Sequence, residues 1–139
     1  MGNTMKLNLF LRWHATHLQE CLNLGHYQIV LNRCQNLRAT MDNTVDCEYL
    51  TSEIRWGNKL EAVWDLGKHA EVVRCLAHEI AHCITSEQTY PMEDRTLKRE
   101  ETFFDERVTE TVGRICYRLY WRWLRETKPK GYKLYRFTP

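Results

Sequence analysis

The sequence predicts a single α+β domain with several helices and a small, mostly antiparallel sheet. Apolar residues recur every three or four positions in long stretches at both ends of the chain, as on the buried face of an amphipathic helix. Two segments in the middle alternate apolar or β-branched residues with polar ones, as strands do. The chain has 139 residues, 43% of them hydrophobic, with only six Gly and three Pro, which suits one domain with its own core.

Residues 5–24 are predicted to form the first helix. Gly25 follows where a left-handed C-terminal cap would sit. The residues at helical spacing are Leu7, Phe10, Leu11, His14, Leu18, Cys21 and Leu22. His14, His17 and Cys21 lie on neighbouring turns, but nothing fixes further metal ligands beside them. We therefore interpret this segment as a packing helix and its histidines as surface or half-buried side chains.

The middle of the chain is predicted to supply the sheet. Residues 27–31 and 49–56 have the alternation of strands, and the polar stretch 36–47 between them is predicted to be a loop. A turn at Gly57 follows. Residues 59–66 suit either a short helix or the return strand of a hairpin, and we favour the strand.

The helix predicted over residues 71–84 carries the motif His78-Glu79-Ile80-Ala81-His82. Two histidines four residues apart lie one above the other on a helix face, so both imidazoles can reach a single zinc ion. A glutamate beside the first histidine can hold the zinc-bound water. This is the HExxH signature of zincins, and it predicts a zinc centre at His78 and His82 with Glu79 as the catalytic base.

A long helix is predicted over about residues 92–125, where an apolar stripe continues at helical spacing. A catalytic zinc site of this type has three protein ligands and one water. Since no histidine follows His82, we expect a downstream carboxylate as the third ligand. The candidates are Glu100, Glu101, Asp105, Glu106 and Glu110.

Two small residues help to choose among these acids. Glu106 and Glu110 lie one turn apart with Thr109 and Gly113 on the same side, so the helix could approach the zinc closely there. We favour Glu106 as the ligand with Glu110 behind it, because metal ligands usually have such orienting neighbours. Glu101 remains the alternative third ligand.

These residues resemble the minimal HExxH metallopeptidase-like domains of bacteria and their phages, a broad gluzincin group that includes ImmA/IrrE-type and SprT-like proteins. The similar stretch covers about residues 49–120. In ImmA/IrrE-type members the downstream helix carries a glutamate followed by a small residue, an acid and an apolar-small pair. That order is found in Glu106, Thr109, Glu110, Val112 and Gly113. The resemblance implies a zincin-like fold of helices around a small sheet, whose edge strand can pair with an extended peptide.

The expected activity is zinc-dependent hydrolysis of a peptide bond in an intracellular protein. Zn²⁺ held by His78, His82 and Glu106 would lower the pKa of its bound water and polarise the substrate carbonyl. Glu79 would take the proton of that water and pass it to the leaving amine. An oxyanion donor is also expected, and Tyr90, just beyond the motif helix, is our candidate.

The formal net charge of +2 hides a basic C-terminal part, because eight Lys and Arg face a single Glu from Arg114 onward. We expect residues 1–125 to form the domain and residues 126–139 a basic, aromatic tail. The alternative function is a non-catalytic zincin-like binding module that binds nucleic acid through this part. The cations expected to contact it are Arg114, Arg118, Arg122, Arg125, Lys128 and Lys130.

The expected location is the cytoplasm of a bacterial or phage-infected cell, without membrane contact. The apolar patch of residues 7–11 is short, is followed by Arg12, and lacks a small-residue cleavage site, which disfavours a signal peptide or a membrane span. The six cysteines form no CxxC pair and are expected to be reduced.

Overall fold

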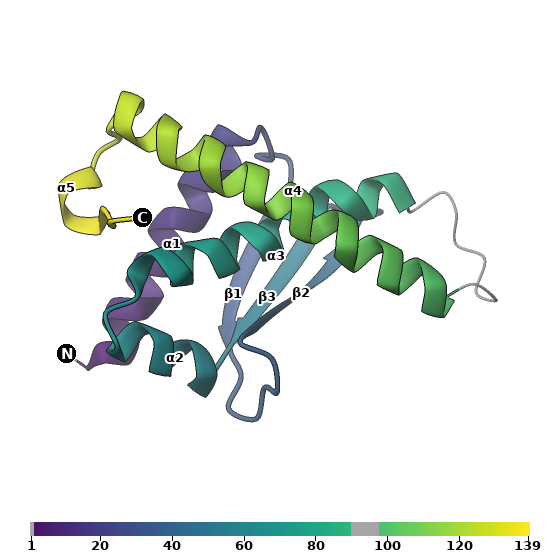
Figure 1. Ribbon diagram of the computed structural model, residues 1–139, viewed down its shortest axis with the longest axis horizontal. Coiled ribbons are helices and arrows are strands. Elements are labelled where there is room, and N and C mark those ends of the chain that lie inside the picture. The colour runs from purple at the N-terminus through teal and green to yellow at the C-terminus, as the bar shows by residue number, and fades with distance from the viewer. Residues whose placement is uncertain (1, 90–97) are drawn as a thin grey trace.

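The computed structural model describes residues 2–89 and 98–139, and over 87–89 and 98–105 it describes the backbone alone. Within these ranges five helices pack with one three-stranded sheet, so the predicted α+β class is confirmed (Figure 1). The helices are α1 (Asn3–Cys21), α2 (Asn58–Asp65), α3 (His69–Thr89), α4 (Lys98–Thr127) and α5 (Tyr132–Tyr135). The strands are β1 (Gln28–Arg33), β2 (Met41–Asp46) and β3 (Thr51–Trp56).

The sheet is mixed, with strand order β1-β3-β2. β3 pairs in parallel with β1, from Gln28 opposite Thr51, and antiparallel with β2, from Met41 opposite Trp56. The prediction of a mostly antiparallel sheet is therefore wrong, because the last strand inserts between the first two. This order leaves β1 and β2 as the two edges of the sheet.

The predicted loop over 36–47 is wrong for residues 41–46, which form β2. Three of its six residues are Asp or Asn, types depleted in strands, which is why the sequence pattern indicated a loop. Side-chain pairs with β3 compensate. The Arg55 guanidinium donates to both carboxylate oxygens of Asp42 at 2.9 and 2.6 Å, and the Ser52 hydroxyl donates to Asn43 Oδ1 at 2.6 Å. β2 is thus a strand because of its neighbour rather than its own propensity.

Residues 58–65 form helix α2, so the return strand favoured from the sequence is wrong. β3 already has a strand on each side, which leaves no free edge on which a hairpin partner could pair. The helix is held by tertiary contacts instead. Leu60 is fully buried, and Arg33 donates to Glu61 Oε1 at 2.6 Å and to Asn58 Oδ1 at 3.0 Å.

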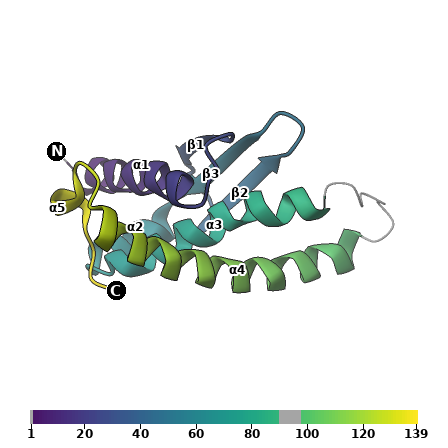
Figure 2. The same ribbon diagram turned by 90° about the horizontal axis from the view of Figure 1, so that it is seen from above.

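Helix α3 lies at the centre of the fold, between the sheet and α4 (Figure 2). Its buried face contributes apolar side chains at helical spacing, among them Val72, Val73 and Ala77, and they meet residues of α1, β3 and α4 in one core. The largest fully buried side chains of that core include Leu7, Leu11, Leu18, Ile54, Trp56, Leu60, Leu76, Ile80, Tyr120 and Leu124. The predicted first and motif helices are present with boundaries shifted by a few residues. The last helix is confirmed from Lys98 onward, and its predicted start at about residue 92 lies outside the described residues.

The C-terminal segment folds back onto α1. The Trp13 indole donates to the Lys130 carbonyl at 3.0 Å and stacks on Tyr135 at 5.4 Å between ring centroids. Gly131 permits this contact: its φ is +90°, and a Cβ there would lie 2.7 Å from Trp13 Nε1. The aromatic residues of the tail therefore pack on the rest of the chain. The domain boundary expected at residue 125 stays a prediction.

His14 is fully buried beneath this segment, whereas a surface or half-buried side chain was expected. Its Nε2 lies 2.7 Å from the Tyr135 carbonyl, which can only accept, so Nε2 carries the proton. Nδ1, 2.7 Å from the Tyr120 hydroxyl, is then the acceptor of a neutral ring. Burial lowers the pKa of His14 from 6.5 to about 3.

This neutral histidine predicts a loss of stability in acid. Below pH 6.5 the unfolded chain binds a proton at His14 that the folded chain refuses until about pH 3. The free energy of unfolding should therefore decrease as the pH is lowered from 6.5 to 3, by up to about 1.4 kcal/mol per pH unit. Urea denaturation at several pH values measures it. His14→Gln should show a flatter pH dependence than the wild type, and parallel profiles for the two proteins would contradict the assignment.

Candidate metal centre

The motif residues of α3 come together as the spacing predicts. One ligand atom each of His78, Glu79 and His82 lies within 4.8 Å of the others, so the group could hold a metal ion. The two imidazoles stand one turn apart with ring centroids 5.2 Å from each other and nearly perpendicular planes. Glu79 is buried, at 8% exposed, while both histidines are half-buried.

Glu106 of α4 reaches the same place from the opposite side. Its Oε1 lies 3.1 Å from His82 Nε2 and its Oε2 lies 3.6 Å from His78 Nε2. One carboxylate thus faces the Nε2 atoms of both histidines, as a third ligand would. The side chain of Glu101 is not among those that the structure describes, and Tyr90 lies outside the described residues, so the roles predicted for them stay predictions.

Small residues on α4 allow the two helices to approach here. A Cβ on Gly113 would lie 3.0 Å from the His78 Cα, tighter than almost all real contacts. Thr109 is fully buried, and its hydroxyl lies 2.8 Å from that of Thr85 on α3. The close packing of α4 on α3 therefore depends on these two positions, and it brings Glu106 to the histidines.

Thr109 also lies beside one of the rings. Its hydroxyl is 3.5 Å from His82 Nδ1, a long contact in which either group can be the donor. When a metal takes the lone pair of Nε2, the atom beside Glu106, the proton of the neutral ring lies on Nδ1 next to this hydroxyl. Such an outer hydrogen bond is typical of histidines that bind metals.

The carboxyl of Glu79 is perturbed by its surroundings. Burial, the negative charge of Glu106 and that of Asp42 raise its pKa from 4.5 to about 8, in that order of importance. Without a cation nearby the group holds its proton at neutral pH. A divalent cation among these residues would favour the carboxylate instead.

The sequence pattern gave no indication of Asn43, which ties the edge strand β2 to this site. Its Nδ2 donates to the Glu79 carbonyl at 2.6 Å, and its Oδ1 accepts from the buried Ser52 hydroxyl. The contact was not expected because residue 43 lies in a segment predicted to be a loop. The side chain sets the distance between β2 and the motif turn of α3.

Replacing Asn43 by Ala should lower the free energy of unfolding by about 1–3 kcal/mol, because it leaves the Glu79 carbonyl and the Ser52 hydroxyl without this partner. Chemical denaturation measures the change. The matched control is Asn32→Ala, which removes an exposed 2.9 Å hydrogen bond to Glu53 and should cost under about 0.5 kcal/mol. Equal effects of the two substitutions would contradict the anchoring role.

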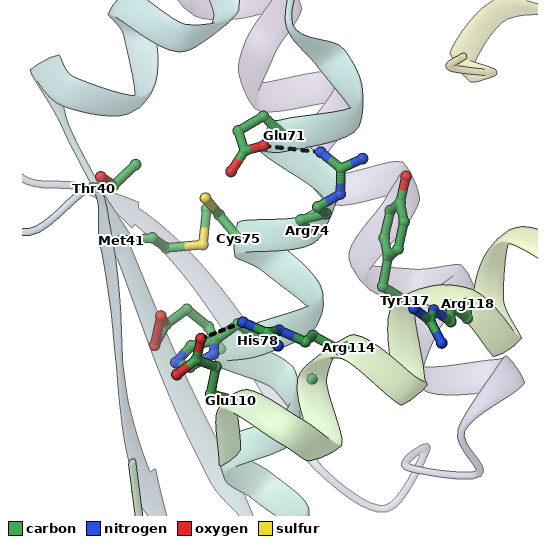
Figure 3. Close-up of a pocket in the computed structure, with 12 residues that line it drawn as sticks. Thr40, Met41, Glu71, Arg74, Cys75, His78, Glu110, Arg114, Tyr117 and Arg118 are labelled. Atoms are coloured by element: carbon green, nitrogen blue, oxygen red, sulfur yellow. Dashed lines mark hydrogen bonds and ion pairs between the residues drawn. The ribbon is translucent and has the colours of Figure 1, made fainter. Parts of the chain in front are cut away.

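A cavity of about 650 Å³ opens beside the histidines (Figure 3). Its walls come from the start of β2, from α3 and from α4, and include Met41, Cys75, His78, Gly113 and Tyr117. Glu79 also lines it. The volume is within the range typical of ligand sites in proteins. His78 and Glu79 of the metal-binding group therefore face a cavity large enough for part of a substrate.

Comparison with protein-family models, curated proteins and solved structures found no match to this chain. The structure itself shows an α+β domain with a His-Glu-x-x-His cluster on a helix, and this cluster could hold a metal ion. Among the described residues, no helix has the length and apolar character needed to cross a bilayer.

Proposed function

We propose that the protein is a zincin-like, zinc-dependent peptidase that hydrolyses a peptide bond in a protein substrate inside a bacterial or phage-infected cell. The observation that carries the proposal is the position of Glu106 opposite both motif histidines, with Glu79 beside them at the wall of a cavity. Two imidazoles and one carboxylate are a ligand set typical of catalytic zinc, which keeps a further position open.

The residues fit a zinc ion in character as well as in number. His82 has its Nδ1 beside a hydroxyl and its Nε2 beside Glu106, which is the arrangement a ligating imidazole needs. When bound, zinc would supply Lewis-acid chemistry, lowering the pKa of a coordinated water and polarising the substrate carbonyl. His78, His82 and Glu106 would hold the ion.

Glu79 would act as the general base and then as the general acid. Its carboxylate would accept the proton of the attacking water and then deliver it to the nitrogen of the leaving amine. The group is mostly buried and lines the cavity, so its carboxylate lies beside the space where the reacting atoms would bind. The Asn43 side chain holds the backbone carbonyl of this residue and so helps to fix where the carboxylate points.

The sheet offers a place for the substrate backbone. β2 is an edge strand and packs beside α3, to which Asn43 connects it. An extended peptide can add to such an edge through main-chain hydrogen bonds. A peptide paired with β2 would run along the cavity that His78 and Glu79 line.

A cleavage assay tests the proposal. Zinc-loaded protein is incubated with denatured bacterial proteins, and new peptide termini are identified by mass spectrometry. We expect cleavage that stops when a chelator removes the metal and returns when zinc is added back. Folded, zinc-loaded protein that cleaves nothing in such a mixture would speak against a peptidase.

The arginines of α4 support a second candidate, a binding module for nucleic acid. All six cations predicted to contact it, Arg114, Arg118, Arg122, Arg125, Lys128 and Lys130, are exposed. The tail aromatics Tyr135 and Phe137 pack against α1, so the contact would be mainly electrostatic. DNA or RNA binding that weakens steeply with salt, and that is lost when Arg118 and Arg122 are neutralised, would favour this candidate.

A further inference from the structure

The cavity beside the metal centre extends along α3 toward its N-terminus. On this helix it is lined by Glu71, Arg74, Cys75, His78 and Glu79, and the first four recur at helical spacing. Glu71 and His78 are two turns apart, or about 10 Å along the axis. A substrate residue bound next to the scissile bond could therefore place its side chain against this face.

Three arginines line the cavity, Arg74 from α3 and Arg114 and Arg118 from α4. Arg74 pairs with Glu71 at 2.9 Å, and Arg114 pairs with Glu110 at 2.7 Å. Arg118 has no ion pair within the part of the chain that the structure describes. Apart from the metal centre itself, the lining thus carries more positive than negative charge.

One of the three arginines, Arg74, is held in place at one end of the cavity. The Arg74 guanidinium lies over the Tyr117 ring, 5.0 Å from its centroid. Figure 3 shows the hydroxyl end of Tyr117 on the same side as that guanidinium. The hydroxyl oxygen is buried and, among the described residues, has no hydrogen-bond partner. The ring contact thus holds the Arg74 guanidinium at this end of the cavity.

One part of the wall is apolar. Met41 lies at the start of β2, and Cys75 lies on α3 across from it, as Figure 3 shows. An apolar wall with a cationic end suits a side chain that has a short aliphatic stem and a terminal carboxylate. It suits a lysine or arginine less well, because two of the three arginines already pair with Glu71 and Glu110 and the charge of Arg118 remains.

We propose that this cavity is a specificity subsite for an acidic side chain, Glu or Asp, of the peptide substrate. The carboxylate would bind to Arg118, which has no ion pair among the described residues, with Arg74 and Arg114 adding positive charge to the cavity lining. This inference rests on the proposed peptidase function, since it names the substrate residue next to the metal centre. It concerns binding, however, and can be measured without hydrolysis.

The test uses the zinc-loaded Glu79→Gln protein and labelled short peptides of mixed sequence in which one position is fixed as Glu, Gln or Lys. Fluorescence anisotropy gives the affinity of each mixture. We expect the Glu mixture to bind about tenfold more tightly than the Gln mixture when the fixed position is the one that enters the cavity, and the Lys mixture to bind most weakly. Equal affinities at every fixed position would overturn the subsite.

Single substitutions then test whether the preference for Glu arises in this cavity. Arg118→Gln removes an exposed, unpaired charge, so the protein should fold normally and lose most of the preference for Glu. Arg122→Gln, one turn further along α4 and outside the cavity lining, is the matched control and should keep it. A preference retained in both variants would overturn the assignment to this cavity. Absence of cleavage by the wild type with the preference intact would overturn the catalytic proposal alone.

Discussion

Replacing Glu79 by Gln should lower the rate of peptide hydrolysis by about 10²- to 10⁴-fold, the range that a positioned general base typically contributes. The amide has nearly the shape of the carboxyl but cannot take the proton of the attacking water. Because His78, His82 and Glu106 remain, the zinc content should not change. The measurement is the initial rate of cleavage of a peptide found in the cleavage assay, together with the zinc content of both proteins.

The matched control for this substitution is Glu126→Gln, the same chemical change at an exposed position of α4. It should cleave at the wild-type rate. Full activity in Glu79→Gln would exclude Glu79 as the base. Loss of activity together with loss of zinc would mean that the residue serves the metal rather than the proton transfer.

Replacing Glu106 by Ala should weaken zinc binding by more than the 10- to 100-fold that changes in outer-shell partners typically cost. The substitution removes the carboxylate that faces both Nε2 atoms, at 3.1 and 3.6 Å. Competition with a zinc chelator of known affinity measures the effect. Since the side chain is more than half exposed, at 55%, its removal should leave the fold intact.

Two other acids of α4 serve as controls for this result. Glu110→Ala removes the acid that was expected to orient Glu106 but pairs with Arg114 in the structure, and Glu101→Ala removes the alternative third ligand. Both variants should bind zinc as the wild type does. A large loss of affinity in Glu101→Ala with none in Glu106→Ala would reverse the choice between the two glutamates.

The sequence was most informative where a local pattern determines the structure. Two histidines four apart on a strongly periodic helix must share one face, so the grouping of His78, Glu79 and His82 followed from spacing alone. Small Thr109 and Gly113 indicated where α4 could approach, and both lie at the helix contact. Proximity of Glu106 to the histidines followed from the same reasoning.

The errors concern residues whose structure depends on distant partners. β2 is a strand because Asp42 and Asn43 pair with side chains of β3, and its own composition favours a loop. Residues 58–65 are helical because β3 has no free edge. The cavity joins Arg74 to Tyr117 across two helices, a contact that no spacing within one helix reveals.

We propose that His78, His82 and Glu106 hold a zinc ion, and the zinc content of protein purified without added metal is the first measurement to make. Elemental analysis of the wild type should give about one zinc per chain, because three protein ligands that face one point bind zinc tightly at neutral pH. A folded protein that contains no zinc, and takes up none when zinc is offered, would contradict the account.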